Sequence, residues 1–327
     1  MAGDATSSVM RAGDVGRAAR RDLQFRIPRK PVVRLGLRAR PEETGWIIDG
    51  ARKSQVLGGA FAREHMGPLL QACDGTRTLD EIGEVTGVGP QAAFEAVSLL
   101  WTGGIVEEGD TEPAPGDPPP ELARLPSRLG DSTGVNASWQ DAARRLAGAR
   151  VAVVGDAELA GEMVAALEPT LPEVRLDSAP RRGDTLTVLV ETADSAARSQ
   201  EVARRCWEEG IPLLRVRAEQ EAVTVGPYVD ETFSPCLACA CADEPEIGPR
   251  PEATRHDIIV GLAARAVAAL IARATVTHLP GDARRTDLAT FTYSDRPVVS
   301  RPGCPVCSVA GAGEEPVPVA PSAPVGA

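Results

Sequence analysis

The sequence predicts an α/β protein with two folded bodies: a small winged helix-turn-helix, then a larger Rossmann-type domain. Short strand-like runs followed by three helical patterns fill residues 29–109. Strands alternate with helices over 136–308, which predicts a mostly parallel sheet covered on both faces. Between them, the Pro-rich stretch TEPAPGDPPPE breaks the pattern, so residues 110–135 are expected to form a linker.

The two ends of the chain lack hydrophobic periodicity. Residues 1–28 are rich in Gly, Ala, Ser and Arg, and residues 309–327 are rich in Pro, Ala and Gly. Both segments are therefore expected to be disordered. With 327 residues, 43% of them hydrophobic but only 3% aromatic, the chain can build two cores, mostly from Ala, Val, Leu and Ile.

The charge and the hydropathy pattern disfavour several classes of protein. A net charge of -11 argues against a nucleic-acid partner, because phosphate binding needs a basic surface. No run of about 18 apolar residues predicts a membrane span, and the N-terminus has no apolar signal-peptide core. We therefore expect a cytoplasmic protein without a membrane partner, in a compartment where CxxC pairs bind metal rather than form disulfides.

The first body has the element order of a winged helix. Its strand-like runs are VVRLGLRA (32–39), GWIIDG (45–50) and KSQVLGG (53–59). Its helical patterns cover 60–75, 78–87 and 90–104, and IVEEG follows as a short strand. Thr78 and Glu81 have the spacing of a capping box. The third helix, QAAFEAVSLLW, has no Lys or Arg, so it is a poor reader of DNA and peptide binding is favoured.

The second body opens with VAVVG, a buried strand that leads into a helical pattern, as in nucleotide-binding α/β units. Further strands are expected at 174–177, 185–194, 211–218 and 221–229, and a long apolar helix at 256–275. Asp177 and Asp194 follow strands. They are either vestiges of ribose and magnesium positions or strand-end caps.

The glycine loop of this body departs from a working phosphate loop. A dinucleotide or ATP loop needs Gly-x-Gly-x-x-Gly, so that the backbone can approach phosphate. Here only Gly155 is in register, and Ala157 adds a methyl group where phosphate would approach. Asp156 and Glu158 add negative charge at a helix start that would otherwise attract an anion. We expect that the domain keeps the nucleotide-binding fold but that its pocket does not bind a nucleotide.

The cysteines carry the strongest chemical signal. Cys236-Leu-Ala-Cys239 and Cys304-Pro-Val-Cys307 are two CxxC knuckles, which together supply the four thiolates of a tetrahedral structural Zn²⁺ site. Four cysteine ligands leave no open position for water, so a catalytic metal is not expected. Cys241 is either a spare thiol or the ligand in place of Cys239.

No nucleophile motif accompanies these cysteines. The three histidines, His65, His256 and His278, stand outside any recognisable catalytic pattern, and there is no Walker loop, HExxH or Gly-x-Ser-x-Gly. Cys73 and Cys206 lie in helical patterns and are expected to be buried core residues.

At the first knuckle the chain resembles a known family. VTVGPYVDETFSPCLACAC resembles the ThiF-like, ubiquitin-activating-enzyme-like fold, and RPGCPVC resembles the second knuckle of its zinc site. With a winged-helix body in front, the chain is similar to the ocin-ThiF-like leader peptide-binding proteins of thiazole/oxazole-modified microcin (TOMM) pathways. In these the winged helix is a PqqD-like recognition element for ribosomal precursor peptides (RiPPs).

The resemblance implies a non-catalytic role. Such proteins bind the leader of a precursor peptide and present it to a YcaO cyclodehydratase, which uses ATP to form azolines from Cys, Ser or Thr. This chain has no YcaO portion, so that enzyme would act in trans, and since many ThiF-like domains pair, a homodimer is also considered. The alternatives are an active ATP-dependent adenylating enzyme, which the glycine loop disfavours, and a winged-helix transcription regulator.

The resemblance also places the peptide site. In the family the leader docks as an extra strand on the third strand of the small sheet, in a groove against the third helix. That strand maps to Arg52, Lys53, Ser54, Gln55, Val56 and Leu57, with Arg52 and Lys53 available for leader acids. On the helix, Phe94, Val97 and Trp101 either line a pocket for apolar leader side chains or belong to the core.

Overall fold

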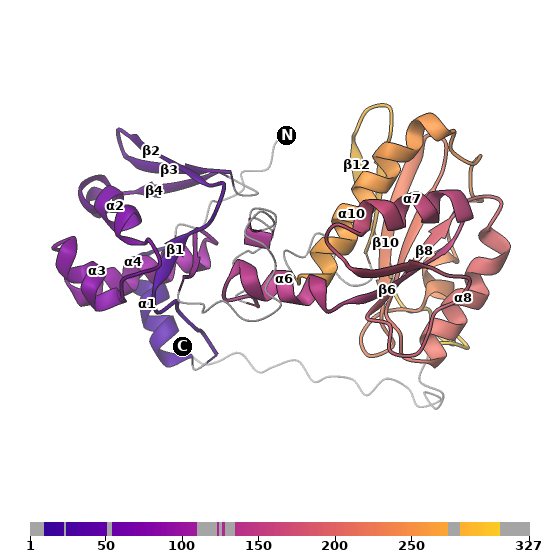
Figure 1. Cartoon of the computed structure of the whole chain (residues 1–327), viewed down its shortest axis with the longest axis horizontal. Helices are drawn as coiled ribbons and strands as arrows, with labels where there is room; N and C mark the ends of the chain where they lie inside the picture. The colour runs from indigo at the N-terminus through magenta and orange to yellow at the C-terminus, as the bar shows by residue number, and fades with distance from the viewer. Residues whose placement is uncertain are drawn as a thin grey trace, which may run out of the picture. The chain divides into compact units, whose positions relative to one another are not determined.

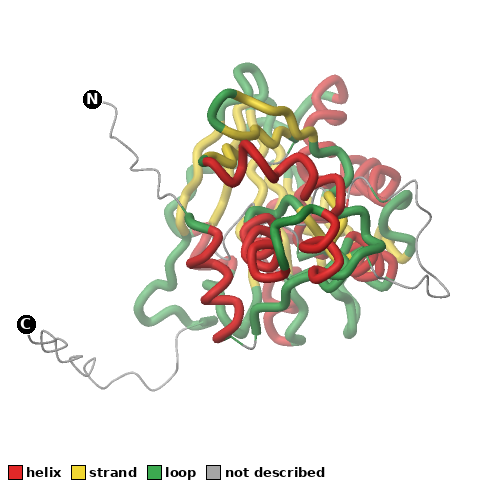
Figure 2. The backbone as a smooth tube through the Cα atoms, turned by 90° about the vertical axis from the view of Figure 1, so that its left-hand side faces the viewer, coloured by secondary structure: helices red, strands yellow, loops and turns green. Residues whose placement is uncertain are grey.

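The structure is a computed structural model, shown in Figures 1 and 2. It describes residues 10–22, 24–50, 54–109, 123, 126–127, 135–273 and 282–307. These residues form two compact units. Unit 1 is built mainly from residues up to 149, together with the second half of the last helix, from residue 265. Unit 2 is built mainly from residues 150 onward. Each unit is described by itself below.

Unit 1 is the expected winged-helix body. Its strands are β1 (Pro31–Val33), β2 (Arg38–Glu42), β3 (Gly45–Asp49), β4 (Gln55–Gly58) and β5 (Val106–Glu108). Its helices are α1 (Ala12–Arg21), α2 (Ala60–Ala72), α3 (Leu79–Val85), α4 (Pro90–Thr102) and α6 (Trp139–Ala147). The antiparallel order β2-β3-β4 leaves β4 at an edge of the small sheet, and β1 pairs separately with β5 as the wing.

Apolar residues from every layer meet in the core of unit 1. Ile48 of β3, Leu69 of α2, Ile82 of α3 and Leu100 of α4 are all fully buried in one cluster. The capping box at the start of α3 is present: Thr78 Oγ1 accepts from the Glu81 N–H, and the Glu81 carboxylate accepts from the Thr78 N–H at 2.7 Å. The local sequence signals of this unit are therefore realised in its packing.

The N-terminal segment differs from the sequence prediction. Disorder is predicted for residues 1–28, whereas α1 occupies Ala12–Arg21 and packs on α4. Two glycines make the helix unpromising by propensity, but they allow close approach: a Cβ at Gly16 would lie 2.7 Å from Cγ of Glu95. Tertiary contact overrides local propensity here.

Unit 2 is an α/β domain with one seven-stranded sheet in the order β12-β11-β10-β9-β8-β6-β7. Its strands are β6 (Arg150–Gly155), β7 (Glu173–Leu176), β8 (Leu186–Glu191), β9 (Leu213–Ala218), β10 (Ala222–Val229), β11 (Asp282–Asp287) and β12 (Tyr293–Pro297). Its helices are α7 (Ala157–Leu167), α8 (Ala196–Glu208), α9 (Leu237–Cys241) and α10 (His256–Ile271), whose second half groups with unit 1. The sequence prediction places α6 in the second body, but α6 also groups with unit 1.

The sheet is mixed rather than mostly parallel as predicted. β6, β8 and β9 run parallel, whereas β9, β10, β11 and β12 follow as an antiparallel meander. The sequence patterns do not indicate the β11–β12 hairpin, because DARRTD and YSDRP are polar and lie at the exposed sheet edge. β7 and β9 lie on opposite sides of the β6–β8 pair, so right-handed crossovers place α7 and α8 on opposite faces (Figure 1).

Among the residues that the structure describes, no helix is both long and apolar enough to cross a bilayer.

Candidate functional site

The four cysteines of the two CxxC knuckles meet in unit 2 and are called the cysteine cluster below. Cys236 and Cys239 flank the first turn of α9, and Cys304 and Cys307 lie in the turn after β12. The Sγ atoms of Cys236 and Cys304 are 3.6 Å apart, and those of Cys239 and Cys307 are 3.5 Å apart. All four sulfur atoms lie within 4.8 Å of one another, so the cluster is positioned to hold a metal ion.

The geometry of the cysteine cluster fits a tetrahedral ion. With metal–sulfur bonds of about 2.3 Å, a tetrahedral site has sulfur atoms about 3.8 Å apart. A disulfide would instead need sulfur atoms at about 2.05 Å. The observed spacings match the first arrangement and exclude the second.

Backbone donors surround the cluster. The Arg301 N–H donates to Cys239 Sγ at 3.3 Å. The N–H groups of Cys307 and Val306 lower the pKa of the Cys304 thiol to about 6, which favours a thiolate at neutral pH. Burial raises the pKa of the Cys236 thiol, and a cation bound by the cluster would oppose this effect.

Three cysteines lie outside the cluster. Cys241 does not join it, which answers the open question in favour of Cys239 as the fourth member. Burial raises the pKa of the Cys241 thiol, although Arg215 acts in the opposite direction. Cys73 and Cys206 are buried as predicted, and burial raises their pKa values to about 12 and about 11, so both are inert thiols.

The glycine loop packs against β8 rather than opening toward a ligand. Gly155 has φ +121°, and a Cβ there would lie 1.9 Å from the Val190 carbonyl oxygen. The glycine is therefore required by the contact between β6 and β8. A Cβ at Gly161 would meet no atom within 4 Å, so close packing does not require that second glycine.

Arg250 sits at the start of α7, where a nucleotide phosphate would bind in a working Rossmann domain. Its Nε and Nη2 donate to the two carboxylate oxygens of Asp156 at 2.9 and 3.1 Å, and Nη2 also donates to Glu158 at 2.7 Å. Asp156 accepts further bonds from Thr192 Oγ1 and from the Leu159 N–H. The Arg250 hydrogen bond is the main reason that the Asp156 pKa falls to about 2.

A buried ion-pair network anchors the segment that carries Arg250. Arg215 Nη1 and Arg217 Nη1 lie 2.6 and 3.1 Å from the same carboxylate oxygen of Glu244. Arg217 also pairs with Glu219 at 2.9 Å, and Glu219 accepts from the Gly248 N–H at 2.7 Å. Residues 244–250 are thereby tied to β9, which holds Arg250 over the glycine loop.

The other acids that the sequence singled out are also bound by the chain itself. Asp177 pairs with Arg175 and Arg181 at 3.2 and 2.7 Å and accepts from the Ser178 N–H, as a strand-end cap does. Asp194 is exposed, 3.9 Å from Arg250. This end of the sheet thus carries acids that arginines already neutralise.

The histidines give no catalytic arrangement among the described residues. His256 is buried, with Nδ1 2.9 Å from a carboxylate oxygen of Glu162. Glu158 lies near this pair, but its carboxylate already accepts a hydrogen bond from Arg250. His65 lies on α2 beside Phe61, with ring centroids 5.2 Å apart. His278 falls outside the described residues.

In unit 1, the backbone of β4 presents free groups at the sheet edge. The Gly59 N–H donates to the Thr44 carbonyl, which makes this a hydrogen-bonded pair. Hydrogen-bonded and non-hydrogen-bonded pairs alternate along an antiparallel ladder. The backbone groups of Leu57 therefore face β3, whereas the N–H and C=O of Val56 point away from β3, toward the open edge. The Val56 side chain is 67% exposed, whereas Leu57 points into the core.

The helix α4 lies beside this edge. Gln55 Nε2 donates to the Gly103 carbonyl at 2.6 Å, which joins β4 to the end of α4. Ala92 and Leu99, both half-buried, share the helix face of Gly103 by helical periodicity. The sequence prediction of the peptide site does not include these two residues, which lie one helix face away from the core positions.

The predicted strand residues of the peptide site fall into two groups. Arg52 and Lys53 lie outside the described residues. Ser54 is exposed and donates to Asp49 at 2.6 Å, and Gln55, Val56 and Leu57 belong to β4 or its edge as expected.

The three predicted residues of α4 do not line a groove beside β4. Val97 is fully buried and Trp101 is 6% exposed, so both side chains belong to the core. Phe94 faces α1, with the Arg20 guanidinium 4.6 Å from its ring centroid. Val97 and Trp101 thus lie on the helix face toward the core, and Phe94 lies on the face toward α1.

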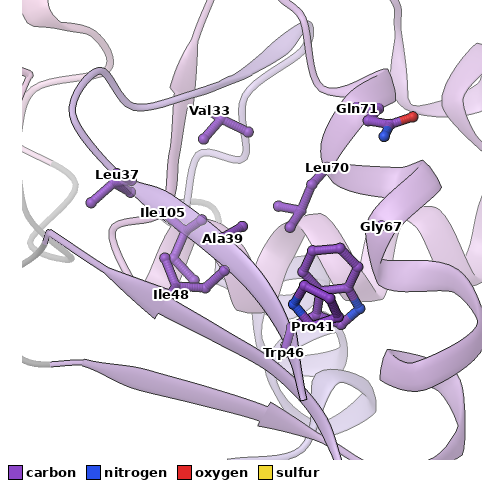
Figure 3. Close-up of a pocket in the computed structure, with 10 residues that line it drawn as sticks. All are labelled: Val33, Leu37, Ala39, Pro41, Trp46, Ile48, Gly67, Leu70, Gln71 and Ile105. Atoms are coloured by element: carbon purple, nitrogen blue, oxygen red, sulfur yellow. The ribbon is translucent and has the colours of Figure 1, made fainter. Parts of the chain in front are cut away.

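An apolar cavity of about 370 Å³ lies between the small sheet and α2 (Figure 3). Trp46 lies against Gly67, where a Cβ would come within 2.7 Å of the indole. No titratable side chain stands among its described lining residues, so the cavity offers packing and shape rather than chemistry. These residues are Val33, Leu37, Ala39, Pro41, Trp46, Ile48, Gly67, Leu70, Gln71 and Ile105.

Comparison with known proteins identifies relatives by structure alone. No family model matches the chain, and no curated protein matches its sequence. Among solved structures, E. coli MccB superposes with a TM-score of 0.67 at 11% identity, covering 85% of this chain and 97% of MccB. The heterocyclase TruD superposes with a TM-score of 0.58 at 16% identity, covering 86% of this chain and 43% of TruD.

A third match is the microcin C7 biosynthetic enzyme MccB in complex with N-formylated MccA, with a TM-score of 0.64 at 11% identity, covering 85% of this chain and 99% of that enzyme. The chain therefore spans less than half the length of the heterocyclase but nearly all of MccB. At these identities the matches establish the fold: a ThiF-like α/β domain with a mixed sheet, joined to a small N-terminal body.

Proposed function

We propose that this protein binds the leader of a ribosomal precursor peptide and presents it to a YcaO cyclodehydratase that acts in trans. The observation that carries the proposal is the free edge of β4, with the Val56 N–H and C=O directed outward beside α4. An extended peptide gains main-chain hydrogen bonds at such an edge, and its alternate side chains meet the helix.

The fold supports this proposal. TruD is a heterocyclase, and MccB is a microcin C7 biosynthetic enzyme that has been solved in complex with N-formylated MccA. The part of TruD that this chain does not span exceeds half of TruD. We propose that a separate enzyme provides the corresponding chemistry, forming azolines from Cys, Ser or Thr with ATP.

The alternative function is an active adenylating enzyme of the ThiF class. Arg250 favours the non-catalytic role, because its bonds to Asp156 and Glu158 occupy the start of α7. A nucleotide would have to break both contacts and then face two acids. The loop also carries Ala157 where a glycine would let the backbone approach phosphate.

The cysteine cluster is proposed to hold one structural Zn²⁺, with Cys236, Cys239, Cys304 and Cys307 as ligands. A closed set of four thiolates supplies stability rather than catalysis. The ion would fasten the chain after β12 to α9 and leave the peptide-binding role to unit 1.

The test measures binding of the precursor peptide encoded beside the gene, labelled with fluorescein, to the purified full chain. Val56→Pro removes the outward N–H without touching the β3 ladder, since proline is tolerated on edge strands. We expect Val56→Pro to weaken binding about tenfold, the equivalent of one lost backbone hydrogen bond of about 1.4 kcal/mol.

The matched control is Val56→Ala, which shortens the same side chain but keeps the N–H, and it should bind within about twofold of the parent protein. Far-ultraviolet circular dichroism checks the fold of both variants. Equal binding by Val56→Pro and the parent protein would reject the β4 edge. Absence of peptide binding together with ATP–pyrophosphate exchange would favour the adenylating enzyme instead.

A further inference from the structure

The charge of the chain is unevenly distributed. Residues 11–40 contain ten Arg or Lys and two Asp, a net charge of +8, whereas the other 297 residues contain 25 cationic and 44 acidic residues, a net charge of -19. Part of this charge is met within unit 1, where Arg34 pairs with Glu107 and Arg40 pairs with Glu42 and Asp49. The surplus of positive charge in an acidic protein indicates an acidic partner.

Much of this charge lies on α1. Arg11, Arg17, Arg20 and Arg21 are all exposed, and they fall within three turns of helix. Arg17 pairs with Asp14 on the surface, and Arg20 bonds the Gln91 side chain. The side chains of Arg11 and Arg21 make no hydrogen bond or ion pair with any residue that the structure describes.

Helix stability accounts for only part of this charge. Arg20 and Arg21 lie in the last turn, where positive charge complements the helix dipole. Arg11 occupies the N-cap, where positive charge opposes it, and Arg17 and Arg21 form a like-charge pair at i, i+4. The arrangement of these arginines therefore favours a role in binding a ligand over a role in stabilising the helix.

The position of α1 connects this surface to the β4 edge. Gly16 packs against Glu95 of α4, and Glu95 lies between the helix face toward α1 and the face of Leu99. Gln55 of β4 bonds the Gly103 carbonyl at the C-terminal end of the same helix, so α1 and β4 both adjoin α4. The basic helix and the proposed peptide site thus adjoin the same helix of unit 1.

We propose that α1 is a docking element for the acidic side chains of the peptide that pairs with β4. This inference rests on the proposed function and adds a substrate class: a leader with Asp or Glu flanking its strand-forming segment. Peptide is favoured over nucleic acid, because the remaining net charge of -19 repels an extended polyanion.

The experiment uses two fluorescein-labelled probes: the precursor peptide encoded beside the gene, and the same peptide with every Asp and Glu of its leader replaced by Asn and Gln. Both are titrated against the full chain at 50 mM and at 500 mM salt, conditions of about 14 and 4 Å screening length. The parent protein should bind the acidic peptide about tenfold more tightly at low salt, and this ratio should fall toward one at high salt.

The variant R11Q/R17Q/R21Q removes three cations and leaves Arg20 on Phe94. It should bind the two peptides within about twofold of each other at low salt. The matched control, R198Q/R204Q/R205Q on α8 of unit 2, removes the same charge and should keep the tenfold ratio.

The outcomes separate the two proposals. An unchanged ratio in R11Q/R17Q/R21Q overturns the role of α1 while the β4 edge stands. Weaker binding of both peptides by Val56→Pro, together with the tenfold affinity ratio between the two peptides in the parent protein, supports both proposals. Failure of the parent protein to bind either peptide rejects the proposed function and this inference with it. Tighter binding of a 20-base-pair DNA duplex than of the acidic peptide, lost in R11Q/R17Q/R21Q, would assign the surface to nucleic acid and overturn the proposal.

Discussion

Single residues decide what the start of α7 can bind. Asp156 is both the N-cap of α7 and the partner of Arg250, so its carboxylate is already bonded on both oxygens. A nucleotide-binding protein would keep this point open for phosphate. The negative charge of Asp156 is thus part of a structural ion pair.

Asp156 gives a pH-dependent prediction. Its pKa is about 2 in the folded chain against an ordinary 3.8, so it stabilises the fold at neutral pH, and this contribution is lost as pH falls from about 4 to about 2. Asp156→Asn should lower the free energy of unfolding at pH 7 by about 1 to 2 kcal/mol, since partial exposure of Arg250 screens the pair.

Urea unfolding of both proteins from pH 7 down to pH 2 measures this effect. The difference in the free energy of unfolding between the parent protein and Asp156→Asn should narrow below pH 4, because Asp156 of the parent protein becomes protonated and loses its charge. Asp194→Asn, at an exposed side chain 3.9 Å from the same guanidinium, is the control and should change little. A gap that stays constant down to pH 2 would contradict the assignment.

Among the elements, α1 shows how a weak helix is held by one neighbour. A ten-residue helix with two internal glycines is marginal in water. It persists on α4 because Gly16 allows the two backbones to approach at Glu95.

The two glycines of α1 therefore predict opposite effects. Gly16→Ala should destabilise α1 by about 1 kcal/mol, because its Cβ would lie 2.7 Å from Cγ and 3.3 Å from Cα of Glu95. Gly13→Ala places its Cβ in ordinary contact, 3.5 Å from a Glu95 carboxylate oxygen, and should stabilise α1 by about 0.5 to 1 kcal/mol.

Amide hydrogen exchange of residues 12–21 distinguishes the two variants. Exchange should quicken in Gly16→Ala and slow in Gly13→Ala, while α8 of unit 2 serves as an internal reference. Equal protection in both variants would show that α1 is not seated on α4 through Gly16.

At the scale of the whole molecule, the cysteine cluster closes unit 2. It joins residues 68 apart in sequence, and Cys304 and Cys307 come after the last strand of the sheet. Closing so long a loop gives a bound metal ion a large effect on stability.

Metal removal should therefore act on one unit. Elemental analysis of the purified protein should give about one zinc ion per chain. A zinc chelator should lower the melting temperature of unit 2 by several degrees and leave unit 1 unchanged. Cys304→Ser should reproduce the shift without chelator, whereas Cys241→Ser should not, since Cys241 lies outside the cluster. A metal-free protein with an unchanged melting profile would contradict the zinc assignment.

Local order was readable from the sequence. The Thr78–Glu81 capping box, the strand VAVVG and the helices of the winged-helix body follow from periodicity and capping, which act over a few residues. The two CxxC knuckles and the degenerate glycine loop were equally plain, because each is a motif of adjacent residues.

Long-range pairing was decided only by the tertiary structure. Arg250 meets Asp156 across 94 residues, and no local pattern marks that contact. The polar β11–β12 hairpin adds two antiparallel strands to the mixed sheet. The helix α1 is stabilised by its packing on α4. Val97 and Trp101 lie in the core because the face of α4 that points inward depends on packing among all the elements of the unit, which no local pattern records. The sequence by itself therefore determined most of the elements and the four cysteines of the cluster. Tertiary packing determined which edge, which helix face and which charges remain available to a partner.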